Sequence, residues 1–104
     1  MKRYYEIVRF TDTWPDQENY YEIEKLVRRG WFRKALEYIN DWNLREDSIS
    51  AARMAGRIWE TPTDPGSPTD SIIYQSGDLT LCHRSDKIGL YQSYYLVGVL
   101  TEED

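Results

Sequence analysis

The chain has 104 residues, enough for one hydrophobic core, and it carries a formal net charge of −5 with a pI of about 4.9. Its single cysteine excludes an intramolecular disulfide, and no run of apolar residues is long enough to span a membrane. Because the start MKRYYEIVRF lacks the apolar stretch of a signal peptide, we expect a cytoplasmic protein with one domain, residues 1–104.

The first predicted element is a β-strand over residues 3–10, RYYEIVRF, which is rich in Tyr, Ile, Val and Phe. Strict alternation predicts two faces, with Tyr5 and Ile7 on one and Val8 and Phe10 on the other. Since a strand needs a hydrogen-bonding neighbour, we expect this one to join a sheet formed by the C-terminal third of the chain.

Helical spacing of apolar residues follows twice. The stripe over residues 17–29 has acids near its start and bases near its end, as the helix dipole favours, and either Thr13 or Asp16 can cap it. Gly30 interrupts the pattern, and a second stripe covers residues 31–42. Two short helices packed as a hairpin, or one bent helix, both satisfy this pattern.

A third helical pattern has Asp47 as its expected N-cap and extends through Ile49 and Ala52 to Ile58. Residues 61–70 then hold three of the four prolines and no large apolar side chain. Because proline fixes φ and removes a backbone donor, neither a helix nor a central strand can form there. We expect a connector within the domain, either a functional loop or a mobile one.

After residue 70 the apolar period changes to two, which predicts strands over residues 71–75, 79–84 and 90–100. Gly77 and Gly89 lie in the short turns between them, where tight hairpins require positive φ. The whole pattern predicts an α+β fold. Its N-terminal strand joins a mainly antiparallel sheet of about four strands, and two or three helices pack on one face.

The lone cysteine and the lone histidine are neighbours, with Asp86 in the next turn, which raises the possibility of a nucleophile and its base. On a strand, however, Cys82 and His83 project to opposite faces. One Cys and one His are too few for a structural zinc site, and no phosphate-binding or dinucleotide-binding glycine motif is present. The sequence therefore predicts no catalytic, metal or cofactor residues, and a protein that is not an enzyme.

Charge is unevenly distributed along the chain. Residues 25–57 hold eight bases and four acids, whereas the rest of the chain holds five bases and 14 acids. The bases concentrate in residues 25–34, at the expected junction of two helices. The candidate partner-binding residues there are Arg28, Arg29, Trp31, Arg33 and Lys34. The same bases can instead pair with Glu22, Glu24 and Glu37 at helical spacing.

Three functions fit this composition. The first is a small non-enzymatic module that binds another protein through exposed aromatic residues and the basic junction. The alternatives are nucleic-acid binding through residues 25–34, and an acidic inhibitor that imitates nucleic acid, of the kind that phages and mobile elements encode. The low pI weakens long-range attraction of nucleic acid, so protein binding is the preferred interpretation. An open sheet edge also leads us to expect that a homodimer can form.

Overall fold

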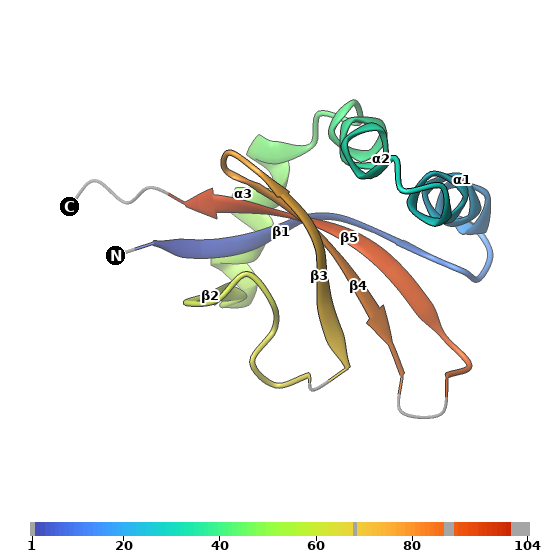
Figure 1. Cartoon of the computed structure of the whole chain (residues 1–104). Helices are drawn as coiled ribbons and strands as arrows, with labels where there is room; N and C mark the ends of the chain where they lie inside the picture. Colours follow the sequence, from blue (N-terminus) through green and yellow to red (C-terminus); the bar gives the residue numbers. More distant parts are fainter. Residues whose placement is uncertain (1, 68, 87–88, 101–104) are drawn as a thin grey trace.

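The computed structural model describes residues 2–67, 69–86 and 89–100, which form three helices and a five-stranded antiparallel sheet (Figure 1). The elements are β1 Arg3–Thr11, α1 Gln17–Arg28, α2 Phe32–Asn40, α3 Arg45–Ala55, β2 Ile58–Trp59, β3 Asp70–Ser76, β4 Leu79–Ser85 and β5 Gln92–Leu100. The strand order is β2-β1-β5-β4-β3. The predicted α+β fold is confirmed, with five strands where about four were expected.

The additional strand is β2. The third helical pattern was expected to continue to Ile58, but α3 ends at Ala55 because Gly56 adopts a left-handed φ of 67°. The chain then turns, and Ile58 and its neighbour pair with β1. Gly30 likewise has a positive φ of 76°, and it separates α1 from α2 as two helices rather than one bent helix.

None of the predicted side-chain caps forms. Asp16 precedes α1, but its carboxylate accepts hydrogen bonds from the backbone N–H and the hydroxyl of Thr11, at 3.0 and 3.1 Å, and not from the helix. Asp47 lies in the first turn of α3, whose N-cap is Leu44. An acid in the first turn still interacts favourably with the helix dipole, so the charge pattern was informative although the cap was misplaced.

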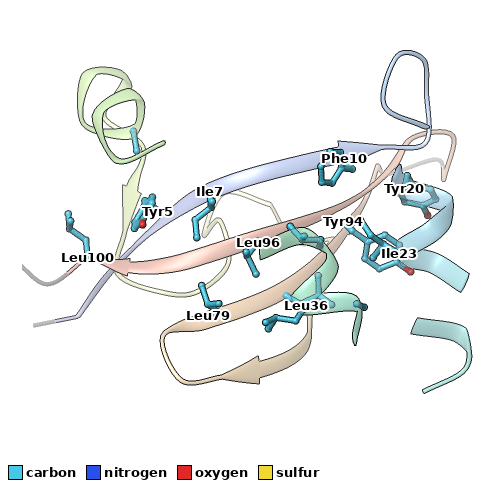
Figure 2. Packing of buried hydrophobic residues seen from close by; sticks show 14 residues of the cluster. Tyr5, Ile7, Phe10, Tyr20, Ile23, Leu36, Leu79, Tyr94, Leu96 and Leu100 are labelled. Atoms are coloured by element: carbon cyan, nitrogen blue, oxygen red, sulfur yellow. The ribbon is translucent and has the colours of Figure 1, made fainter. Parts of the chain in front are cut away.

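The helices cover one face of the sheet, and the main hydrophobic core lies between this helical layer and the sheet (Figure 2). Its buried members are Tyr5, Ile7, Phe10, Tyr20, Ile23, Ala35, Leu36, Ile39, Ala52, Leu79, Leu81, Tyr94, Leu96 and Leu100. The three helices and strands β1, β4 and β5 contribute these buried residues, and the partly buried Ile73 and Tyr74 of β3 pack against them. Within the described part of the chain, no helix combines the length and apolarity needed to cross a membrane.

A β-bulge in β1 changes which side chains reach the core. The register with β5 shifts between Glu6 and Val8, and beyond the shift Val8 and Phe10 face the helices, as Tyr5 and Ile7 do. The prediction that Val8 and Phe10 lie on the opposite face is therefore wrong. Alternation fails here because the extra residue of a bulge resets the side-chain period.

The connector covers the opposite face of the sheet. There Cys82, Tyr95 and Val97 form a second, smaller buried cluster, against which Trp59 packs. The thiol of Cys82 donates to the carbonyl of Pro62 at 3.9 Å, so the connector lies directly over this cluster. The sequence placed helices on one face, and the structure shows that a proline-rich segment covers the other.

Candidate functional site

The predicted partner-binding residues lie together where α1 gives way to α2. Arg28 ends α1, Arg29 and Trp31 belong to the connection, and Arg33 and Lys34 lie in the first turn of α2. All five are exposed. The chain folds this way because Gly30, between the two helices, tolerates the positive φ that reverses the backbone.

Two of these bases are paired within their own helices. Arg28 lies 3.2 Å from the Glu24 carboxylate, and Arg33 lies 3.3 Å from the Glu37 carboxylate, each four residues apart. Pairing of the bases with glutamates at helical spacing was the alternative interpretation of the sequence, and the structure shows it for these two arginines. Pairs this exposed contribute only about 0.3–0.5 kcal/mol, so a partner's carboxylate can replace the internal one at little cost.

Arg29 and Lys34 have a different environment, because both lie over the ring of Trp31. The guanidinium carbon of Arg29 is 5.1 Å from the ring centroid, and the Lys34 Nζ is 4.6 Å from it. Among the described residues, no carboxylate forms an ion pair with either base. Trp31 is 45% exposed. The two cations are therefore held at the rim of an exposed aromatic side chain and are open to an acidic ligand.

Trp31 and Phe32 line a hollow of about 510 Å³ that extends from α2 to the edge strand β3. Its lining residues are Gly30, Trp31, Phe32, Arg33, Lys34, Glu37 and Tyr74. The rings of Phe32 and Tyr74 are stacked, with centroids 6.3 Å apart and an angle of 21° between their planes. We call the six residues Arg29, Trp31, Phe32, Arg33, Lys34 and Tyr74 the basic aromatic surface.

Tyr74 was not among the predicted site residues, and a second β-bulge explains why. The register of β3 with β4 shifts between Ile72 and Tyr74, so that Ile72 lies opposite Cys82 while Tyr74 lies opposite Leu81, which faces the helices. Without the bulge, Ile72 and Tyr74 would share the connector face. The extra residue directs Tyr74 toward α2, and no local pattern in the sequence signals it.

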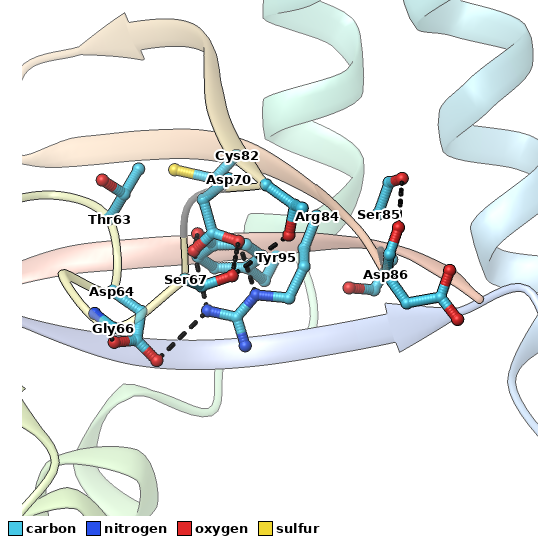
Figure 3. A network of polar contacts seen from close by, with 12 residues as sticks. Thr63, Asp64, Gly66, Ser67, Asp70, Cys82, Arg84, Ser85, Asp86 and Tyr95 are labelled. Atoms are coloured by element: carbon cyan, nitrogen blue, oxygen red, sulfur yellow. Dashed lines mark hydrogen bonds and ion pairs between the residues drawn. The ribbon is translucent and has the colours of Figure 1, made fainter. Parts of the chain in front are cut away.

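A polar network on the connector face is the second candidate site (Figure 3). The Asp70 side chain, only 1% exposed, accepts hydrogen bonds from Arg84 Nε at 2.5 Å and Nη2 at 2.7 Å. It also accepts from the hydroxyls of Tyr95, at 2.6 Å, and Ser67, at 3.1 Å. Arg84 in turn reaches Asp64 of the connector at 3.4 Å. The network thus ties the middle and the end of the connector to β4 and β5.

The electrostatics of this network favour the charged pair. Burial raises the pKa of Asp70, but the hydrogen bonds from Arg84, Tyr95 and Ser67, together with the Arg84 charge, outweigh it and hold the pKa below its usual value. Burial and the hydrogen bond to Asp70 raise the pKa of Tyr95, so its hydroxyl stays protonated as a donor. Every oxygen of the buried carboxylate is satisfied, which indicates a structural role.

A cavity of about 370 Å³ lies beside this network, lined by Arg9, Arg84 and several hydroxyl-bearing side chains. Both arginines are already matched, since Arg9 contacts the Glu6 carboxylate and Arg84 binds Asp70 and Asp64. The two cations therefore offer no net positive charge to a ligand. This cavity is a weaker candidate than the basic aromatic surface.

Cys82 and His83 lie on opposite faces of β4, as the sequence predicted. Cys82 belongs to the buried cluster under the connector, and burial raises the pKa of its thiol to about 12. On the helix side, His83 Nε2 lies 3.1 Å from the side-chain oxygen of Gln92, and its ring packs on Tyr94. Burial lowers the pKa of His83. The two side chains cannot act together as nucleophile and base.

Among residues 2–67, 69–86 and 89–100, no three His, Cys, Asp or Glu side chains gather in a way that would hold a metal ion. Comparison of the chain with protein-family models, with curated proteins and with solved structures gives no match.

Proposed function

We propose that the chain is a non-enzymatic protein-binding module of the cytoplasm, and that the basic aromatic surface binds an acidic segment of a partner protein. The observation that supports this proposal is the apolar hollow formed by Trp31, Phe32 and Tyr74, with cations at its rim. Trp, Tyr and Arg side chains are the ones that most often dominate binding energy in protein interfaces.

Charge supports the choice of an acidic partner. Arg29 and Lys34 are held over Trp31, and Arg33 has only an exposed internal partner in Glu37. The whole chain carries a net charge of −5, whereas residues 25–34 contain five bases and no acid, so positive charge is concentrated at this surface. Such asymmetry steers a charged partner to one surface and disfavours other orientations.

The two alternative functions have less support. Binding of nucleic acid needs several bases along a phosphate backbone, whereas Arg28 and Arg33 are paired within their helices and the net charge is negative. An acidic mimic needs carboxylates gathered on one surface. Here Glu24, Glu37 and Asp70 lie on three different elements, and each is paired with an arginine.

Selection from a random peptide display library tests the proposal. The wild-type chain serves as bait, and the double variant Trp31→Ala, Phe32→Ala serves for counter-selection. We expect the enriched peptides to combine Asp or Glu with bulky apolar residues. Their affinity for the double variant, measured by fluorescence anisotropy, should be at least about tenfold weaker, as the loss of an aromatic anchor predicts.

Two further variants make the test specific. Trp14→Ala removes another exposed tryptophan, 82% exposed and outside the surface, and it should leave binding unchanged. The double charge reversal Arg29→Glu, Lys34→Glu alters only exposed side chains and should abolish binding while the circular dichroism spectrum stays native. Peptides without acidic enrichment, or equal binding to all four proteins, would refute the proposal. Tighter binding of a single-stranded oligonucleotide than of any selected peptide would favour the nucleic-acid alternative.

A further inference from the structure

The edge of the sheet beside the basic aromatic surface is open. β3 is the last strand in the sheet order, with β4 on one side and no strand of the described chain on the other. The side chains of Ser71, Ile72, Gln75 and Ser76 are exposed along it, and Ile72 is 47% exposed. The strand contains neither Lys nor Pro, the residues with which proteins commonly protect an exposed edge.

The opposite edge of the sheet is protected, which makes β3 distinctive. β2 contributes only two residues there, and α3 packs along β1 (Figure 1). The hydroxyl of Ser48 in α3 lies 2.5 Å from the carbonyl of Ile7, at the bulge, and 2.6 Å from the carbonyl of Leu44, and its single proton can be donated to either. A second hollow, of about 270 Å³, lies at that edge between β1 and α3. In the described part of the chain, the β3 edge differs because it lies beside the basic aromatic surface.

Hairpin geometry indicates which backbone groups of β3 are available. Ser76 and Leu79 flank a two-residue turn whose first residue, Gly77, has φ of 59°. In such hairpins the flanking residues form the hydrogen-bonded pair, and the next residue along the strand directs its N–H and C=O outward. Gln75 is that residue. It is the immediate neighbour of Tyr74, whose ring lines the hollow.

We propose that the acidic partner segment binds as an extended strand that adds to β3 at Gln75. This inference rests on the proposed function, because the same segment inserts an apolar side chain into the hollow beside Tyr74 and directs carboxylates toward Arg33 and Lys34. Strand addition combines main-chain hydrogen bonds with pockets for alternate side chains, and both are present side by side here. The bulge shortens the available ladder, so the hollow contributes much of the affinity.

A second copy of the chain is a less suitable occupant. Two β3 strands that paired edge to edge would each bring Arg29, Arg33 and Lys34 toward the junction. Like charges across an interface oppose association, whereas an acidic segment from another protein compensates them. The proposal therefore commits to a separate acidic protein, and self-association becomes an outcome that the experiment can detect.

The test uses the tightest peptide from the display selection, synthesised in three forms: one unmodified, and two in which alternate backbone nitrogens are methylated, along one edge or along the other. Methylation removes the hydrogen-bond donors of that edge and leaves the side chains and charge of the peptide intact. If the segment adds to β3, methylation of the edge that faces β3 should weaken binding at least about tenfold, whereas methylation of the other edge should change it less than about twofold. Hydrogen exchange at the Gln75 amide should slow when the unmodified peptide is bound.

The outcomes separate this inference from the proposed function. If both methylated forms bind as tightly as the plain peptide, yet binding still requires Trp31 and Phe32, strand addition is refuted and the binding surface stands. If no selected peptide depends on Trp31 and Phe32, the proposed function itself fails. Sedimentation that shows a dimer of the free chain, disrupted by Ile72→Lys, would instead assign the edge to a second copy and overturn the inference.

Discussion

Replacing Asp70 by Asn removes the negative charge at the centre of the connector network while keeping its size. Arg84, whose side chain is 22% exposed, then loses its bidentate partner and keeps only Asp64, at 3.4 Å. Breaking one partner of a buried ion pair costs about 3–5 kcal/mol. Because Arg84 keeps some contact with water and a second carboxylate, we expect Asp70→Asn to lower the free energy of unfolding by about 3 kcal/mol.

Urea unfolding at pH 7, followed by tryptophan fluorescence, measures this change. Tyr95→Phe is the matched control, since it removes one hydrogen bond to the same carboxylate and should cost about 1.5 kcal/mol. Asp64→Asn removes the weaker and more exposed contact and should cost less than about 1 kcal/mol. This ranking separates the loss of a buried charge from the loss of a single contact.

The pH dependence gives a second readout. The pKa of Asp70 is lower in the folded protein than the ordinary carboxyl value of 3.8, so its contribution is complete above that value and is lost as pH falls through the folded pKa. The stability gap between wild type and Asp70→Asn should therefore narrow below about pH 4. A gap under about 1 kcal/mol at neutral pH, or one that widens in acid, would refute this account of the network.

Three further predictions concern the two faces of the sheet. Gly98→Ala should lower the free energy of unfolding by about 1–2 kcal/mol in urea, because the new Cβ would lie 3.0 Å from the Tyr5 ring; an unchanged urea midpoint would show that the ring moves freely. Burial raises the thiol pKa of Cys82 to about 12, so the native thiol should not react with Ellman's reagent at pH 8. Addition of urea should make the same thiol react at once, and equal rates in both states would contradict the burial. Burial lowers the pKa of His83 below 6.5, so the unfolded chain binds a proton first and stability should fall as pH decreases from 6.5 toward the folded pKa. NMR titration of the imidazole checks this, and a value at or above 6.5 would count against it.

Much of the secondary structure could be predicted because it depends on local patterns. Helical spacing located α1, α2 and most of α3, and the change to a period of two located the three C-terminal strands. Gly30 and Gly77 marked reversals that only positive φ permits. The separation of Cys82 from His83 also followed from local geometry, since adjacent residues of a regular strand point to opposite faces.

The basic half of the candidate site could be predicted for the same reason. Arg28, Arg29, Trp31, Arg33 and Lys34 are close in sequence, so any helical junction brings them together. Their individual environments could not be predicted, because a base at helical spacing from a glutamate can pair with it or can lie over an aromatic ring. The structure pairs Arg28 internally and leaves Arg29 and Lys34 at the rim of Trp31.

The amino-acid sequence by itself determined which segments form the helical layer and which form the sheet. It also determined where the chain reverses between elements and where positive charge is clustered. Only the tertiary structure decided that Tyr74 lines the hollow, that Ile58 belongs to a strand, and that the connector covers the second face. The physical reason is that bulges, edge pairing and coverage of a face depend on partners distant in the chain. Periodicity describes only neighbours along the backbone, so it cannot locate an extra residue that is defined by the strand opposite.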